Sequence, residues 1–280
     1  MATITTVITG ATSGIGEATA IALAKQGHAL HLLVRDIEKG AALKQKLIAD
    51  TGNKNIHVIK CDLADLASVA QAADELSGKL FNINVLINNA GGMFSNYATS
   101  KDGFEMTFAS NHLGHFLLTV RLMPLLQRGH ARVINVSSDM HQTGKPRYGN
   151  LKSPEGYSAV KAYSDSKLFN IYFTKSLAER FADSGVTAYA LHPGVVKTQF
   201  NAKLSGFLKF FFSLSAPFAI TPEKGADTSV YLATAPKLAI KSGSYYIKRK
   251  AKATAAIVND LDARNKLWAL SEEFVAPFKV

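Results

Sequence analysis

Two tyrosine–lysine pairs have the spacing that acid–base chemistry on a hydroxyl group would need. In each pair, Tyr157/Lys161 and Tyr163/Lys167, the lysine stands four residues after the tyrosine. Residues at this spacing share one face of a helix, so the ammonium could lower the tyrosine pKa from its usual value of about 10. Such a tyrosine can take a proton from an alcohol or return one to an alkoxide. Both pairs cannot be catalytic, and the spacing alone does not choose between them.

A glycine-rich segment, Thr9-Gly10-Ala11-Thr12-Ser13-Gly14-Ile15-Gly16, stands between the first predicted strand and the first predicted helix. Its glycine spacing differs from the G-x-G-x-x-G pattern of many dinucleotide-binding proteins. Glycine nevertheless lets the backbone turn tightly and approach a pyrophosphate at the N-terminus of the next helix. The alternative is a strand–helix turn without a ligand, and the position in the first strand–helix unit favours the dinucleotide.

Short β-branched runs alternate with longer helical patterns along most of the chain. The predicted strands are 4–9, 29–34, 55–60, 84–87, 132–136 and 186–191, and the predicted helices are 14–26, 37–50, 65–79, 103–128 and 157–182. This order predicts an α/β fold, a doubly wound parallel sheet of Rossmann type with helices on both faces. Right-handed crossovers then bring the carboxyl ends of the strands to one edge, where ligands bind. No linker or repeat is visible, so residues 1–280 are predicted to form a single domain.

Further motifs follow the later strands at regular places. They are Asn88-Asn89-Ala90-Gly91 after the fourth strand, Ser138 after the fifth, the Tyr-x-x-x-Lys pair on the next helix, and Pro193-Gly194 after the sixth. Together with the glycine turn, and in this order, these motifs closely resemble the short-chain dehydrogenase/reductase family. Stretches at 111–116, 166–170, 192–196, 225–226 and 267–268 resemble its retinol-dehydrogenase-like branch. The resemblance therefore extends over nearly the whole chain.

The resemblance implies a tetrad that performs the acid–base chemistry: Asn111, Ser138, Tyr163 and Lys167. The Ser138 hydroxyl would stabilise charge on the substrate oxygen, with Ser137 as a competing candidate and turn chemistry as the alternative for either serine. Asn111 would hold a water near Lys167 for a proton relay. The alternative for Asn111 is a buried asparagine that is hydrogen-bonded to the backbone.

Between the two tyrosines, the resemblance favours Tyr163. It stands 30 residues before Pro193, against 36 for Tyr157, and the shorter spacing is typical of the family. Tyr157 would then lie in the first turn of the helix, with Lys161 solvated.

A nicotinamide dinucleotide is the cofactor that the resemblance implies. Its predicted contacts are Gly10, Thr12, Ser13, Gly14, Ile15, Gly16, Arg35, Asp62, Leu63, Asn89, Ala90, Gly91, Tyr163, Lys167, Pro193, Gly194, Val196 and Thr198. Asp62 and Leu63 would contact the adenine, and Asp62 could also cap the following helix. Thr198 would lie near the carboxamide of the nicotinamide.

The end of the second predicted strand, Val34-Arg35-Asp36, indicates which dinucleotide is bound. A basic residue there accommodates a ribose 2′-phosphate, whereas an acidic residue accepts hydrogen bonds from the 2′-hydroxyl. Arg35 can form a charge-assisted fork with phosphate, and Asp36 could instead cap the next helix. We therefore expect NADP(H) to be preferred, with NAD(H) as the alternative.

These residues predict an NADP(H)-dependent oxidoreductase that interconverts an alcohol and a carbonyl. An apolar aldehyde, ketone or retinoid-like substrate would enter between residues 139–156, the 92–98 loop and the phenylalanine-rich segment that follows Thr198. Residues 199–221 are the predicted substrate lid, with a core segment or a membrane-surface contact as alternatives. The alternative function is a non-catalytic NADP(H)-binding sensor module, against which the complete tetrad argues. A second alternative is a lyase or epimerase that acts on nucleotide-activated sugars. Such proteins often carry a longer substrate domain and a G-x-x-G-x-x-G turn, and this chain shows neither.

Composition and residue spacing indicate which partners, location and metal content to expect. The net charge of +11 indicates a solvated basic surface, and its densest cluster, residues 248–252, lacks the aromatic residues of a nucleic-acid site. A single cysteine, Cys61, no secretory signal and no long apolar run predict a cytoplasmic protein. His115 and His192 lack partners at ligand spacing, so no metal is predicted. Members of this family often pair through helices beside the sheet, which could give a homodimer or homotetramer.

Overall fold

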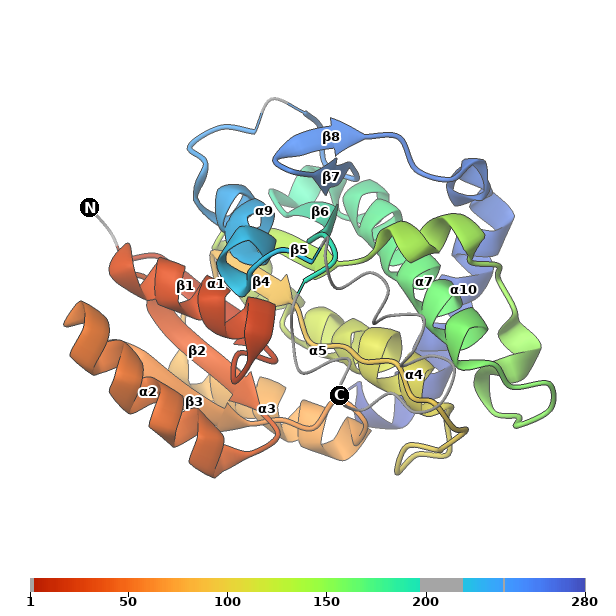
Figure 1. Ribbon diagram of the computed structural model, residues 1–280, viewed down its shortest axis with the longest axis horizontal. Helices are drawn as coiled ribbons and strands as arrows, with labels where there is room; N and C mark the ends of the chain where they lie inside the picture. Colours follow the sequence, from red (N-terminus) through yellow and green to blue (C-terminus); the bar gives the residue numbers. More distant parts are fainter. Residues whose placement is uncertain (1–2, 197–218, 239, 280) are drawn as a thin grey trace.

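The computed structural model describes residues 3–196, 219–238 and 240–279. In this part of the chain one eight-stranded sheet forms the central layer, in the order β3-β2-β1-β4-β5-β6-β7-β8 (Figure 1). The strands are β1 (Thr5–Thr9), β2 (Ala29–Val34), β3 (Ile56–Lys60), β4 (Val85–Asn88), β5 (Arg132–Val136), β6 (Thr187–His192), β7 (Tyr245–Ile247) and β8 (Lys250–Lys252). Every neighbouring pair is parallel except β7–β8. Strand order reverses between β1 and β4, which confirms the predicted doubly wound α/β fold.

Helices cover both faces of the sheet (Figure 1). One layer holds α1 (Gly14–Lys25), α2 (Ile37–Thr51) and α9 (Pro222–Thr234), and the other holds α3 (Leu66–Lys79), α5 (Gly114–Arg121), α7 (Ala159–Arg180) and α10 (Leu261–Val275). Successive residues of a strand point to opposite faces, so Val7 joins the core beneath α3, α5 and α7, whereas Ile8 joins the core beneath α1 and α2. Each face therefore has its own apolar core.

The long helix predicted over 103–128 is wrong, because the structure divides this region. It contains α4 (Met106–Phe108), a π-helical turn at Ala109–Leu113, α5, and α6 (Met123–Arg128). In the π turn the Gly114 N–H donates to the Ala109 carbonyl, five residues back, which shifts the helical register by one residue. Further on, Pro124 has no N–H to continue a helix, so α6 begins separately.

Helix α7 begins later than the sequence predicts. The Ser158 side chain accepts a hydrogen bond from the Lys161 N–H at 3.5 Å and caps a helix that starts at Ala159. The prediction that Tyr157 lies in the first turn is therefore wrong, since Tyr157 precedes the cap. Shorter 3₁₀ turns lie at Asp139–Thr143, Tyr148–Leu151, Ala182–Ser184, Ala256–Asn259 and Ala276–Phe278.

Strands β7 and β8 form a hairpin that the sequence patterns do not predict. Its two turn residues, Lys248 and Arg249, both have positive φ, 50° and 61°, as a two-residue hairpin turn requires. Asn-Gly or Asp-Gly usually marks such a turn, and neither occurs here. An ion pair with Asp227 and a backbone hydrogen bond to Thr228 hold Arg249 in place. The basic cluster 248–252 is therefore the edge hairpin of the sheet.

Helix α10 packs against α5 and α7 in the same layer. Its Trp268 ring lies 5.0 Å from the Phe116 ring and 6.0 Å from the Phe173 ring, measured between centroids. Aromatic contacts of this kind bury large apolar areas and dominate core energetics. The C-terminal helix is thus a structural part of the layer that carries the candidate site.

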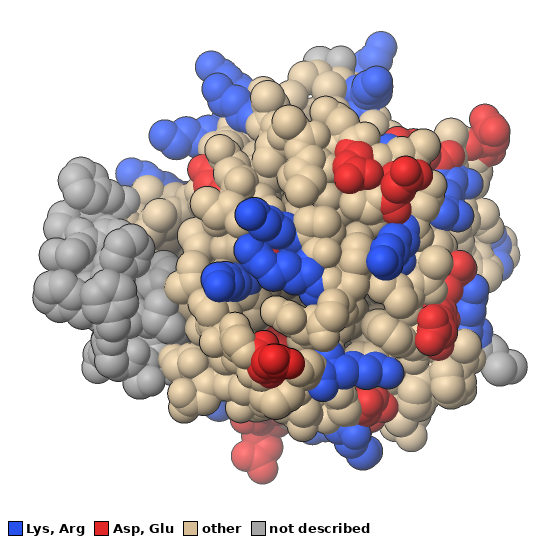
Figure 2. Space-filling view, turned by 90° about the vertical axis from the view of Figure 1, so that its right-hand side faces the viewer, with Lys and Arg blue, Asp and Glu red and all other residues tan. Residues whose placement is uncertain are grey.

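The surface carries charges of both signs. Figure 2 shows Lys and Arg side chains interspersed with Asp and Glu, with one close group of basic side chains near the centre of the visible face. This mixture fits a solvated basic surface. Among the helices of the described ranges, none has the length and apolarity to cross a membrane.

Two helical glycines provide a matched test of packing between α5 and the turn after β3. A Cβ at Gly114 would collide with the Leu63 carbonyl oxygen, whereas a Cβ at Gly78 in α3 would meet nothing within 4 Å. We expect Gly114→Ala to lower the free energy of unfolding by about 2 kcal/mol or more, and Gly78→Ala to raise it by about 0.5–1 kcal/mol. Urea denaturation of both variants measures the two changes, and a stable Gly114→Ala protein would contradict the close contact.

Candidate active site

The hydroxyl of Thr9 joins two turns at the carboxyl edge of the sheet. Its Oγ1 accepts hydrogen bonds from the N–H groups of Asn89 and Ala90, both at 3.0 Å. The Asn89 amide in turn donates to the Thr9 carbonyl at 2.9 Å. A Cβ at Gly10 would lie 2.9 Å from the Ala90 Cα, so only glycine lets the two turns approach this closely. The glycine turn and the turn that contains Ala90 and Gly91 therefore form one unit.

The glycine turn leaves the N-terminus of α1 suited to an anion. Gly10 and Gly14 have positive φ, 66° and 54°, and a Cβ at Gly16 would collide with the Gly10 carbonyl. Ser13 is the N-cap residue, but its side chain makes no capping hydrogen bond within the described ranges. Thr12 is half-buried beside it. N–H groups at an uncapped helix start attract phosphate oxygens, so this turn fits the pyrophosphate of a dinucleotide.

Ile15 and Val196 both lie against Gly225. A Cβ at Gly225 in α9 would lie 2.7 Å from Val196 Cγ2 and 3.2 Å from Ile15 Cγ1. The absent side chain therefore lets α9 support the segments that follow β1 and β6.

Two basic residues lie where β2 and β3 end. Arg35 directly follows β2 and is exposed, and the Lys60 ammonium at the end of β3 donates to the Arg35 carbonyl. Asp36 is the N-cap of α2, since its carboxylate accepts from the Lys39 N–H at 3.1 Å. This hydrogen bond and the Lys39 ammonium lower the pKa of Asp36. The sequence motifs do not identify Lys60, which only the pairing of β2 with β3 places beside Arg35.

Asp62 does not cap the helix that follows it. Its carboxylate accepts from the Ala64 N–H at 3.0 Å, and the N-cap of α3 is Asp65, which accepts from the Ser68 N–H at 3.2 Å. The expectation of a helix cap at Asp62 is therefore wrong, because the helix begins three residues later. Leu63 is 8% exposed.

Tyr163 and Lys167 lie on α7 next to the end of β5. The Lys167 Nζ is 5.3 Å from the centroid of the Tyr163 ring and donates to the Val136 carbonyl at 3.1 Å. Lys167 is 3% exposed, and burial lowers its pKa to about 8. Burial raises the pKa of Tyr163 to about 12, and a hydrogen bond with the Ser138 side chain opposes that rise. The structure thus brings together three members of the predicted tetrad.

The two neighbouring serines have different partners. Ser138 contacts Tyr163, and its Oγ also accepts from the Met140 N–H at 3.2 Å at the start of a 3₁₀ turn. The Ser137 hydroxyl donates to the Lys167 carbonyl at 2.7 Å. Ser137 therefore ties β5 to α7, while Ser138 is the serine that meets the tyrosine.

Asn111 is fully buried in the π turn, and its side chain forms hydrogen bonds with the turn after β4. The amide donates to the Gly92 carbonyl at 2.9 Å and to Ser166 Oγ at 3.0 Å, and its oxygen accepts from the Gly92 N–H at 2.8 Å. A Cβ at Gly91 would lie 3.1 Å from Asn111 Oδ1 and 3.4 Å from Lys167 Nζ. The side chain of Asn111 is thus hydrogen-bonded to the backbone, and Asn111 and Lys167 both border Gly91.

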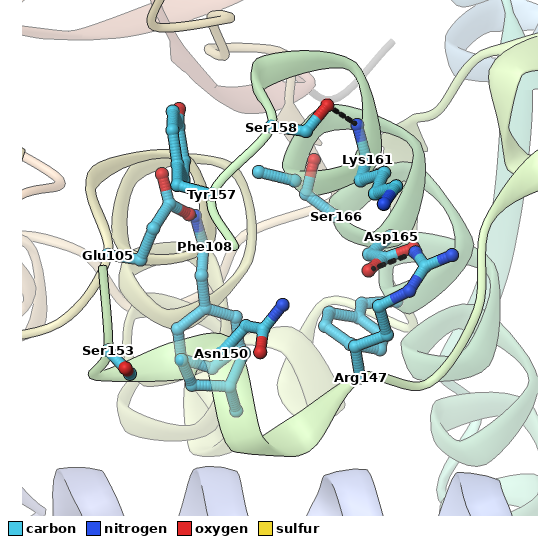
Figure 3. A pocket seen from close by; sticks show the side chains of 13 residues that line it. Glu105, Phe108, Arg147, Asn150, Ser153, Tyr157, Ser158, Lys161, Asp165 and Ser166 are labelled. Atoms are coloured by element: carbon cyan, nitrogen blue, oxygen red, sulfur yellow. Dashed lines mark hydrogen bonds and ion pairs between the residues drawn. The ribbon is translucent and has the colours of Figure 1, made fainter. Parts of the chain in front are cut away.

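The other tyrosine–lysine pair has a different environment. The Tyr157 hydroxyl donates to the Phe94 carbonyl at 2.6 Å, which fastens the 92–98 loop to the start of α7. Lys161 is exposed, as the sequence predicts. In Figure 3, Tyr157 and Lys161 line a small cavity of about 30 Å³ together with Glu105, Asp165 and Arg147.

An ion pair fastens the segment after Ser138 to α7 (Figure 3). The Arg147 guanidinium donates to both oxygens of Asp165 at 2.6 and 2.8 Å, and the Lys145 N–H donates to the same carboxylate at 2.7 Å. A Cβ at Gly144 would lie 2.6 Å from the Ser164 carbonyl, so the backbone runs directly along the helix. Residues 144–147 of this segment are therefore bound to α7 rather than free, which the sequence patterns do not indicate.

The segment after β6 is described only as far as Val196. Gly194 has a φ of 97°, and the Ile220 N–H donates to the Val195 carbonyl at 2.8 Å. Val196 and Ile220 form a parallel bridge. Pro193 is half-buried before this bridge. Thr198 and the predicted lid, except for residues 219–221, lie outside the described residues.

Metal-ligating side chains do not cluster in the described ranges. No group of three or more His, Cys, Asp or Glu side chains there could hold a metal ion. The groups that meet at the site are a phenol, an ammonium, a hydroxyl and backbone amides.

Comparisons with known proteins agree with this geometry. The family model of short chain dehydrogenases matches residues 5–208. Human retinol dehydrogenase 11 is 39% identical over 266 residues, which cover 95% of this chain and 83% of the relative. Mouse retinol dehydrogenase 11 is 42% identical over 241 residues, with coverages of 86% and 76%.

Solved structures show the same fold. An uncharacterized protein from Mycobacterium paratuberculosis has 34% identity and a TM-score of 0.79, covering 98% of this chain and 94% of that one. RhlG from Pseudomonas aeruginosa, solved as an NADP complex, has 25% identity and a TM-score of 0.69, with coverages of 88% and 94%. The chain therefore belongs to the short-chain dehydrogenase family and is an oxidoreductase of its retinol-dehydrogenase-like branch.

Proposed function

We propose that this protein is an NADP(H)-dependent oxidoreductase that interconverts an alcohol and a carbonyl on an apolar aldehyde, ketone or retinoid-like substrate. The observation that carries the proposal is the meeting of Ser138, Tyr163 and Lys167 beside the glycine turn. When bound, the nicotinamide would supply or accept the hydride. The chain's own residues would then manage the proton and the charge on the substrate oxygen.

Tyr163 would act as the acid in reduction and as the base in oxidation. As the carbonyl carbon gains a hydride, its oxygen takes the phenol proton, and the product is the alcohol. The Ser138 hydroxyl would stabilise the developing charge on that oxygen. The Lys167 ammonium would favour the ionised phenol and offset the burial that raises the Tyr163 pKa. Asn111 would fix the turn on which the nicotinamide ribose lies.

The preference for NADP(H) is supported by the ends of β2 and β3. Arg35 and Lys60 place two cations at this point, and the carboxylate of Asp36 is committed to the start of α2. A ribose 2′-phosphate would meet both cations, whereas a 2′-hydroxyl would find no free acid in Asp36. The NADP complex of RhlG supports the same preference.

The substrate class is supported by the curated relatives, which include retinol dehydrogenases 11, 12, 13 and 14. The phenylalanine-rich stretch within the predicted lid, residues 199–221, is consistent with an apolar substrate. NADPH oxidation with a panel of apolar aldehydes and ketones tests the proposal. NADPH binding without turnover on any of them would favour the sensor alternative. A cytoplasmic location and a homodimer or homotetramer stay predictions.

The two tyrosines give a matched pair of variants. Tyr163→Phe should lower kcat by a factor of about 10² or more, since it removes the acid–base group. Tyr157→Phe removes the hydrogen bond to Phe94 and the side-chain contacts with Glu105 and Thr107, none of which belongs to the tetrad, and should keep kcat within about tenfold. Steady-state kinetics on the best substrate of the panel measures both. Loss of activity in Tyr157→Phe with activity kept in Tyr163→Phe would reverse the assignment.

The cofactor preference can be tested at the ends of β2 and β3. Arg35→Ala and Lys60→Ala should each raise the KM for NADPH by about tenfold and change the KM for NADH by less than about twofold, because only NADPH carries the 2′-phosphate. Lys54→Ala, which removes an equal charge just before β3, is the control and should change neither value. An unchanged KM for NADPH in Arg35→Ala would contradict the NADP(H) assignment.

The pH profile should report the ionisation of Tyr163. Reduction uses the protonated phenol and oxidation the ionised one, so reduction falls and oxidation rises as the pH passes the apparent pKa of Tyr163. Lys167→Met removes the nearby charge and should move both limbs upward by about one pH unit or more. Measurements of kcat/KM in both directions between about pH 6 and 10 test this. Superimposable profiles for the two proteins would show that Lys167 does not tune the tyrosine.

A further inference from the structure

His115 lies beneath the candidate site, 2% exposed, and both of its ring nitrogens have a partner. Its Nε2 is 2.9 Å from Thr9 Oγ1 at the end of β1. Its Nδ1 is 3.1 Å from the backbone oxygen of Asn111 in the π turn. One imidazole therefore spans the strand that leads into the glycine turn and the turn that carries a tetrad residue.

The partners of His115 determine which nitrogen carries the proton. A backbone carbonyl can only accept, so the Nδ1 must donate to Asn111. Burial lowers the pKa of His115 to about 4, so the ring is neutral near pH 7 and its Nε2 has no proton. Nε2 is then the acceptor, and the Thr9 hydroxyl donates to it at 2.9 Å rather than to the Ile87 carbonyl, which is 3.4 Å away.

These bonds close a ring around the turn after β4. The N–H groups of Asn89 and Ala90 donate to Thr9, Thr9 donates to His115, and His115 donates to the carbonyl of Asn111. The Asn111 side chain then returns to the same turn through both backbone groups of Gly92. In this chain of hydrogen bonds each donor faces an acceptor. A buried polar network that is satisfied in this way makes a site rigid.

We infer that His115 is a positioning residue: it fixes the Thr9 hydroxyl and the Asn111 carbonyl together, and so sets the turn 89–92 relative to Lys167. The inference rests on the proposed function, in which the nicotinamide ribose lies on that turn. His115 itself touches neither substrate nor cofactor and acts through Thr9 and Asn111. Loss of the imidazole would leave the turn bonded to Thr9 and to Asn111, but it would break the link between the Thr9 hydroxyl and the Asn111 carbonyl.

His112, three residues earlier in the π turn, offers a matched control. It is 1% exposed, it is also neutral because burial lowers its pKa to about 3, and its Nε2 is 3.0 Å from Ser271 Oγ on α10. Its Nε2 therefore contacts the C-terminal helix, and its other hydrogen-bond partner is Asn170 on α7, so neither contact reaches the turn after β4. A change at His112 removes a buried imidazole of equal size without breaking the ring of hydrogen bonds.

The first experiment compares His115→Phe with His112→Phe. Both variants should lower the Tm, but only His115→Phe should weaken NADPH binding, measured by nucleotide fluorescence, and lower kcat, each by about tenfold. Adding Thr9→Val to His115→Phe should change NADPH binding less than Thr9→Val does in the wild type, because the two changes break the same bond. Equal effects of the two histidine variants on NADPH binding, or none, would overturn the inference.

The second experiment needs neither a variant nor a substrate. Nitrogen NMR of the full chain labelled in histidine should show His115 protonated at Nδ1 and unprotonated at Nε2, unchanged between about pH 5.5 and 8. The opposite tautomer, or titration of His115 in this range, would overturn the inference even if His115→Phe failed to fold. A wild-type protein that binds NADPH but turns over no carbonyl would defeat the proposed function, while the binding and NMR comparisons would still test His115.

Discussion

Lys167 carries its ammonium group into the protein interior, where the Nζ donates to the Val136 carbonyl at the end of β5. Removing a cation from water is unfavourable, and the result is a lysine pKa of about 8, while burial moves the Tyr163 pKa the other way, to about 12. The pKa of each side chain therefore differs from its ordinary value. The ammonium and an ionised phenol can stabilise each other's charge only when the two groups are close together. Ser137, which holds the Lys167 backbone, keeps that distance fixed.

Close approach of backbones is the means by which the fold achieves this precision. Gly10 brings the end of β1 against Ala90, Gly114 brings α5 against Leu63, and Gly144 brings the segment after β5 against α7. At each point a side chain would hold the two backbones apart. The sheet sets the carboxyl ends of β1, β4 and β5 side by side, and the glycines remove the remaining gap between the turns that follow them.

The sequence predicts the parts of this arrangement that follow from local pattern. Strands such as β2, buried on both faces, appear as nearly continuous apolar runs, and the glycine turn marks the first strand–helix unit. The π turn is not predictable in this way, since Ala109–Leu113 falls within the region 103–128 that the sequence predicts as one helix. Residue type does not mark the positive φ values at Lys248 and Arg249, and contacts to α9 hold Arg249.

Contacts between distant residues form the second group that the sequence does not reveal. Lys60 meets Arg35 only because β2 pairs with β3, and His115 meets Thr9 across 106 residues. Arg147 and Asp165 are both charged residues that a sequence pattern would place at the surface, yet they join a segment to α7. The candidate tetrad could be named from motifs, whereas the residues that hold it in position could not.

The position of α10 affects how the protein folds during its synthesis on the ribosome. The rings of Phe116 and Phe173 are covered by Trp268, so this part of the core stays open until residues 261–275 have left the ribosome. The layer that carries α5 and α7 must therefore complete its packing after synthesis of the last helix rather than strand by strand. Until then the nascent chain presents an aromatic surface of the kind that chaperones bind.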